Sequence, residues 1–84
     1  KQPDALMQMA ELAQEGGNGL QARAFLERYT AVAPVTAATL WLGRNIELGL
    51  GDAAQAARYS QRLKNEFPTS EEASRLFEAE RAKP

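Results

Sequence analysis

The chain lacks cysteine and histidine altogether, and it carries little net charge. Without cysteine it has no disulfides, no zinc–thiolate sites and no thiol nucleophile. Without histidine it lacks the commonest general base and the commonest metal ligand. The formal net charge over 84 residues is −1, and acids and bases are interleaved, so no basic patch for nucleic acid stands out. No apolar run approaches the about 20 residues that cross a bilayer. We expect no cofactor, no metal, no nucleic-acid partner and no direct membrane insertion by this segment.

The chain does contain an internal repeat with an offset of 34 residues. The matched pairs are Gly17-Asn18 with Gly51-Asp52, Gln21-Ala22 with Gln55-Ala56, Phe25 with Tyr59, Arg28 with Arg62, and Pro34 with Pro68. Thirty-four residues is the length of the tetratricopeptide unit, a helix–turn–helix that stacks into a solenoid. The sequence therefore predicts an all-α fold, a tetratricopeptide-repeat (TPR) solenoid of antiparallel helix hairpins with about two repeats and a C-terminal capping helix.

Glycines and prolines predict where the helices of each unit end. Gly17 and Gly51 are suited to the left-handed conformation that ends a helix, and Asn18 and Asp52 are expected to cap the helices that follow. Proline lacks the amide hydrogen that a helix interior requires, so Pro34 and its equivalent end the second helix of each unit.

Small residues predict where the two helices of a hairpin cross. We expect Ala10 to pack near Ala22, and Gly43 near Ala56. The second pair is 13 residues apart and the first is 12 apart, so the second unit carries one extra residue near its turn.

Apolar residues at helical spacing predict five helices, over about 4–15, 20–32, 36–50, 53–66 and 70–82. Thr36 is a predicted cap, and Thr69-x-x-Glu72 is a predicted capping box for the fifth helix. No segment alternates with period two, so no strand is expected. We interpret 1–84 as a single domain with repeats at 3–36 and 37–70.

The fifth helix is either the first helix of a third unit or a terminal cap. Two units and a cap are fewer than the roughly three repeats that a stable array needs, so we expect the C-terminal part of a longer array. The face of the first helix with Met7 and Met9 should then be partly bare, and self-association through that face is expected.

The second half of the chain resembles a particular family of repeat proteins. The residues that carry the likeness are Leu40-Trp41-Leu42-Gly43, Ile46-Glu47, Leu50-Gly51-Asp52, Ala56, Tyr59, Gln61-Arg62-Leu63 and Phe67-Pro68-Thr69-Ser70-Glu71. This pattern resembles the end of the type IV pilus biogenesis/stability lipoproteins of the PilF/PilW type, known as pilotins. The resemblance implies a factor on the periplasmic side of the bacterial outer membrane that helps the pilus secretin to localise and oligomerise. The family's lipidated cysteine has no counterpart here, so an anchor is expected outside this segment.

In such solenoids the first helices of successive units line a concave groove. We predict that six residues on or near this side bind a protein partner: Met7, Glu11, Trp41, Arg44, Asn45 and Arg75. Trp41 has two interpretations, an exposed binding anchor or a residue packed between adjacent first helices. Arg44 and Glu47 are three residues apart on a helix, which favours a solvated ion pair.

No catalytic constellation is evident in the sequence. Tyr29 and Tyr59 lie at core spacing on second helices, and the glycine-rich turn at 16–19 lacks the Lys-Ser/Thr of a phosphate loop. We therefore predict a non-enzymatic protein–protein interaction module of a pilus assembly factor whose partner is the secretin subunit. The alternative is a generic TPR scaffold segment of another multi-domain protein.

Overall fold

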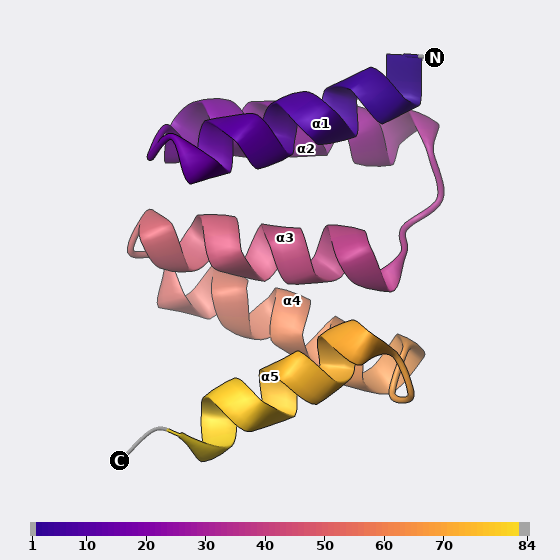
Figure 1. Ribbon diagram of the computed structural model, residues 1–84, viewed down its shortest axis with the longest axis vertical. Coiled ribbons are helices and arrows are strands. Elements are labelled where there is room, and N and C mark those ends of the chain that lie inside the picture. Colours follow the sequence, from indigo (N-terminus) through magenta and orange to yellow (C-terminus); the bar gives the residue numbers. More distant parts are fainter. Residues whose placement is uncertain (1, 83–84) are drawn as a thin grey trace.

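The computed structural model describes residues 2–82, and it contains five helices in this part of the chain. They are α1 (Gln2–Glu15), α2 (Gly19–Val32), α3 (Ala37–Gly49), α4 (Ala53–Glu66) and α5 (Glu71–Arg81). Figure 1 shows α1 and α2 as an antiparallel hairpin at one end, α3 and α4 as a second hairpin, and α5 at the other end. The predicted all-α solenoid of helix hairpins is confirmed.

The turns inside the two hairpins have the same length and the same geometry, so the predicted extra residue near the second turn is wrong. Gly17 and Gly51 adopt φ values of 79° and 81°, the left-handed conformation that favours glycine. In the first turn the Asn18 amide donates to the Ala13 carbonyl at 2.8 Å, and in the second the Asp52 amide donates to the Glu47 carbonyl at 2.9 Å. Both are Schellman motifs, in which the left-handed glycine lets the chain satisfy the last carbonyls of the helix.

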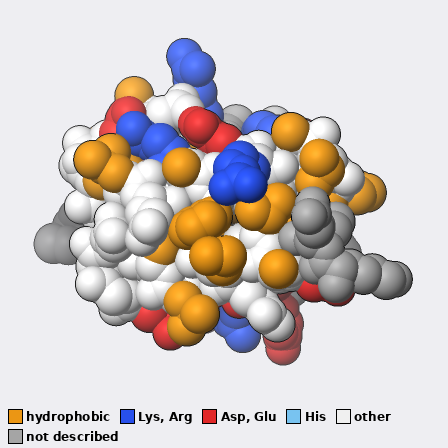
Figure 2. Space-filling model, turned by 90° about the horizontal axis from the view of Figure 1, so that it is seen from above, with side chains coloured by type: hydrophobic (Ala, Val, Ile, Leu, Met, Phe, Trp, Pro, Cys, Tyr) orange, Lys and Arg blue, Asp and Glu red, His pale blue; other side chains and the backbone are white. Residues whose placement is uncertain are grey.

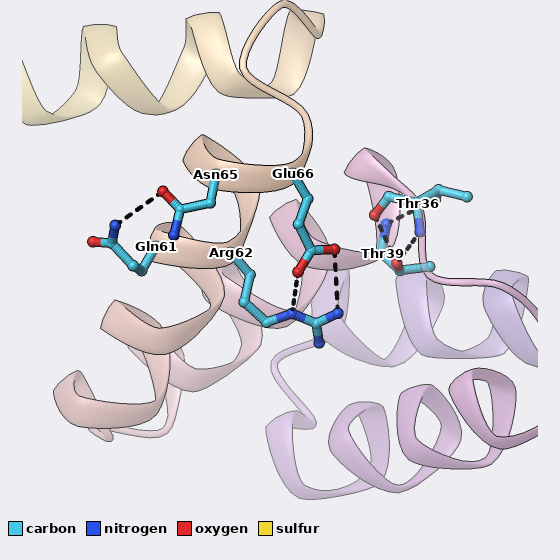
Figure 3. A network of polar contacts seen from close by, with 6 residues as sticks. All are labelled: Thr36, Thr39, Gln61, Arg62, Asn65 and Glu66. Atoms are coloured by element: carbon cyan, nitrogen blue, oxygen red, sulfur yellow. Dashed lines mark hydrogen bonds and ion pairs between the residues drawn. The ribbon is translucent and has the colours of Figure 1, made fainter.

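Two of the predicted helix caps are confirmed. The Thr36 hydroxyl accepts from the Thr39 amide, and the Thr39 hydroxyl accepts from the Thr36 amide, so that α3 begins with a reciprocal capping box (Figure 3). The Asp52 carboxylate accepts from the Gln55 amide at 3.1 Å and caps α4. Each bond satisfies an amide that the first turn of a helix leaves without a partner.

The other two predicted caps are wrong. Asn18 lies at the N-cap position of α2, but its side chain accepts no cap bond, and its amide group donates to the Gln21 side chain at 2.9 Å. At α5 the cap is Ser70 and not Thr69, since the Ser70 hydroxyl accepts from the Ala73 amide at 3.0 Å.

The core consists of two clusters of buried residues, and α3 contributes to both. The first cluster joins α1 and α2 to α3 through Ala10, Ala22, Leu26, Leu42 and Ile46. The second joins α3 to α4 and α5 through Leu40, Leu63, Ala73 and Leu76. Since α3 is apolar on two sides, it is the central helix of the stack.

The crossing of α3 and α4 differs from the prediction. The side chain that faces Gly43 is Tyr59, not Ala56, since a Cβ atom added at Gly43 would lie 2.5 Å from the Tyr59 ring. The tyrosine ring therefore occupies the space that the missing side chain leaves. Burial there raises the pKa of Tyr59 above its usual value, because the phenolate is poorly solvated.

An ion pair between a partly exposed arginine and a buried carboxylate links the first hairpin to the second. The Arg23 guanidinium on α2 donates from Nε to Oε2 of Glu47 on α3 at 3.0 Å, and a second donor meets Oε1 of the same carboxylate. Glu47 is only 3 % exposed, and the two donors of Arg23 satisfy both oxygens of its carboxylate. The predicted pairing of Glu47 with Arg44 is wrong, because a residue 24 positions away takes its place.

Candidate protein-binding surface

A hollow of about 300 Å³ lies between the first helices of the units, and we call it the first-helix groove. It is lined by Glu11, Gln14 and Glu15 of α1, by Ala38, Trp41, Leu42 and Asn45 of α3, and by Glu72 and Arg75 of α5. These helices follow one another from top to bottom in Figure 1, as the solenoid arrangement requires.

Four of the six predicted binding residues line this groove: Glu11, Trp41, Asn45 and Arg75. Met7 does not, because its half-buried side chain packs against the first core cluster. Arg44 does not either. It lines a separate hollow of about 290 Å³ between α3, α4 and the C-terminal end of α5. The structure therefore gathers most of the predicted set at one place, and their role as a binding site stays a prediction.

Trp41 is half-buried, which is intermediate between its two interpretations. One part of its side chain packs against the second core cluster, and the residue also lines the groove. The Arg44 guanidinium lies over the indole ring, 4.9 Å from its centre, and donates a hydrogen bond to the Asn45 side chain at 2.8 Å. Such stacking of a cation on an aromatic face holds both side chains in place. Trp41 thus presents an apolar surface whose orientation is already fixed.

A hydrogen bond joins the two helices that form the upper part of the groove. The Gln14 side-chain amide on α1 donates to the backbone carbonyl of Asn45 on α3 at 3.2 Å. Sequence reasoning missed Gln14, since a bond across 31 residues leaves no signal in local spacing. It also missed Glu15, although the four-residue spacing from Glu11 places both on one helix face.

On the outer face of α4, four polar side chains pair with one another. Arg62 pairs with Glu66 at 3.0 Å, and Gln61 donates to Asn65 at 3.2 Å (Figure 3). These pairs are one helical turn apart, the spacing that supports an exposed helix.

A second apolar surface covers the outward side of the first hairpin, and we call it the α1–α2 face. Two hollows of about 420 and 200 Å³ share Met9 there and include Leu6, Leu12, Phe25 and Arg28. Figure 2 shows hydrophobic side chains gathered at this end of the molecule. Met9 is 46 % exposed, so the predicted bare face is confirmed for that residue. The prediction is wrong for Met7, which lies against the core.

Within residues 2–82, no group of three or more acidic side chains is placed to hold a metal ion. No helix in that range is both long and apolar enough to cross a membrane.

The fold and its groove define a solenoid of stacked helix hairpins. A family model described as tetratricopeptide repeat matches residues 4–34 and 37–70, and the chain belongs to that family. Repeats of this family form a non-catalytic fold that mediates protein–protein interactions. No curated protein and no solved structure shows a significant match.

Proposed function

We propose that this chain is the partner-binding region of a type IV pilus assembly factor of the pilotin type. In this proposal it acts on the periplasmic side of the bacterial outer membrane, has no enzymatic role, and promotes the localisation and oligomerisation of the secretin. Membership of the repeat family supports protein binding in general. The segment from Leu40 to Glu71 resembles the pilotins, and this resemblance supports the secretin as the particular partner.

The single observation that carries the proposal is the half-buried Trp41 in the first-helix groove. Binding hot spots are enriched in tryptophan, and truncation of a hot-spot residue typically costs at least about 2 kcal/mol of binding free energy. Charges at the rim, such as Arg75, mainly change association rates and salt sensitivity. The groove thus offers one anchor and a polar border.

The test compares Trp41→Ala with Arg75→Ala in cells that assemble the pilus. We expect Trp41→Ala to lower the level of secretin multimers far more than Arg75→Ala does. Circular dichroism must show helical content equal to that of the unaltered chain, since Trp41 also contacts the second core cluster. A well-folded Trp41→Ala protein with normal multimer levels would contradict the proposal.

A pull-down with detergent-solubilised secretin addresses the alternative of a generic scaffold. The pilotin proposal predicts retention of the secretin by the unaltered chain and its loss with Trp41→Ala. A scaffold segment without a partner of its own would retain no secretin in either form.

A further inference from the structure

The carboxylates of this protein divide into two groups. Six of them form ion pairs: Glu47, Asp52, Glu66, Glu71, Glu78 and Glu80. Five form none with any residue of the described part of the chain: Asp4, Glu11, Glu15, Glu27 and Glu72. Three of these five, Glu11, Glu15 and Glu72, line the first-helix groove. Negative charge without a partner is therefore concentrated at one place.

Two of these carboxylates are placed where the fold gains nothing from them. Glu11 and Glu15 lie four residues apart on α1, a spacing at which like charges destabilise a helix. Glu15 is also the last residue of α1, where the helix dipole disfavours negative charge, and the last turn contains no basic residue. Glu72 differs, since it lies in the first turn of α5, where the dipole favours a carboxylate. Glu11 and Glu15 thus lack a structural explanation.

An apolar surface lies beside these two carboxylates. Trp41 and the buried Leu42 of α3 line the same groove, and the Gln14–Asn45 hydrogen bond fixes α1 against α3. Two cations lie at the groove: Arg75, which lines it 3.7 Å from Glu71, and Arg44, whose guanidinium lies over the Trp41 ring at 4.9 Å. The groove therefore combines an acidic wall on α1 with an apolar wall on α3.

We propose that the first-helix groove binds a cationic, partly apolar segment of a protein partner. One or two Arg or Lys side chains of this segment meet Glu11 and Glu15, and an apolar side chain packs against Trp41. An acidic segment is disfavoured, because the three carboxylates without ion pairs outnumber the two guanidiniums, and Arg75 already lies beside Glu71 while Arg44 is stacked on Trp41. Arginine fits best, since its planar fork can donate two hydrogen bonds to one carboxylate. This inference rests on the proposed protein-binding function and adds the chemistry of the partner.

The test uses two matched sets of fluorescein-labelled synthetic peptides of 12 residues. Both sets carry the same Leu and Phe residues; one set contains two Arg residues and the other contains two Glu residues at the same positions. Fluorescence anisotropy with the whole 84-residue chain should show at least about 10-fold tighter binding of the Arg set at 50 mM salt. The difference should shrink at 300 mM salt, because rim charges are screened. The single Trp41 indole N–H signal in an NMR spectrum should shift on binding.

Substitutions at Glu11 and Glu15 test whether these two carboxylates bind the cationic segment. The double variant Glu11→Gln with Glu15→Gln should lose about 10-fold in affinity for the Arg set. Glu27→Gln is the matched control, an exposed carboxylate without an ion pair on α2 outside the groove, and it should bind as the unaltered chain does. The double variant should also melt at a higher temperature, because a repulsion is removed. If Glu11 and Glu15 had a purely structural role, the double variant would melt at a lower temperature.

Three results would overturn the inference: equal binding of the two sets, no binding by either set, or unchanged affinity in the double variant. Retained binding at the Trp41 indole without dependence on Glu11 and Glu15 would remove the inference and leave the proposed function standing. Normal secretin multimers with Trp41→Ala would instead remove the proposed function, whatever the peptides show.

Discussion

The two hairpins follow the same 34-residue plan, yet their equivalent residues lie in different environments. Leu12 of α1 is 67 % exposed, whereas its equivalent Ile46 on α3 is fully buried. The second hairpin lies between α2 on one side and α5 on the other, and the first hairpin is covered on one side only. In a solenoid each unit gains stability from its neighbours, so position in the stack decides what an apolar residue contributes.

The difference extends to the size of the side chain that each position tolerates. Met9 lies on the bare α1–α2 face, and its equivalent is Gly43, which is buried beneath the Tyr59 ring. The covered hairpin thus requires a glycine where the uncovered one has a long, flexible side chain. Tyr59 belongs to α4 of the same hairpin, so this constraint on size comes from the partner helix within the unit.

The largest difference in stability should be between two separate truncations, Ile46→Ala and Leu12→Ala. Ile46→Ala leaves a cavity in the first core cluster and should lower the free energy of unfolding by about 2–5 kcal/mol. Leu12→Ala, at the equivalent position, should change it by less than about 0.5 kcal/mol, as is usual for surface substitutions. Urea unfolding followed by circular dichroism measures both. Equal losses would show that α1 is covered in solution.

The next effect concerns the crossing of α3 and α4. Gly43→Leu should cost about 1–3 kcal/mol, because the new side chain overlaps the Tyr59 ring and the hairpin must open to admit it. Met9→Leu at the equivalent position is the control and should be close to neutral. Thermal melts compare the two variants, and an unchanged melting temperature for Gly43→Leu would contradict the observed crossing.

The link between the hairpins gives a similar or slightly smaller effect. Arg23→Met leaves the buried Glu47 carboxylate without its two donors and should cost about 1–3 kcal/mol. Arg58→Met removes an exposed arginine that has no ion pair in the described part of the chain, and it should be close to neutral. Urea unfolding at pH 7 provides the measurement. A neutral Arg23→Met would mean that Glu47 reaches water once its partner is gone.

The smallest effect is weak self-association through the α1–α2 face. An exposed apolar patch of this kind favours contact with a second apolar surface, so sedimentation velocity should show a concentration-dependent dimer. Met9→Glu should abolish it, whereas Leu48→Glu, at an exposed leucine of α3 away from this face, should not. A monomer at all concentrations would show that the patch is too small to bind another copy.

The sequence predicts the local features of this fold well. The helices lie within a few residues of their expected bounds, and both left-handed glycines are where the 34-residue offset places them. These features depend on residues within one helical turn, such as Thr36 with Thr39 and Asp52 with Gln55. Local hydrogen bonds leave a local signal.

Two errors are local, the missing cap bond of Asn18 and the cap at Ser70 in place of Thr69, and the errors in packing occur where distant residues compete. Glu47 pairs with Arg23 of the preceding hairpin and not with the nearby Arg44. Gly43 faces Tyr59, which lies one helical turn beyond the expected Ala56. Four of the six candidate site residues reach one groove, but Gln14 and its bond to α3 depend on the angle between helices. The spacing of residues along one helix gives no information about the angle between two helices.

The most direct test of the binding surface is site-specific photo-cross-linking in cells that assemble the pilus. A photoreactive phenylalanine analogue replaces either Ala38, an exposed residue of the first-helix groove, or Arg58, an exposed residue outside it. The proposed function predicts a cross-link to the secretin from position 38 and none from position 58. A cross-link from position 58 alone, with an intact fold in both proteins, would contradict it.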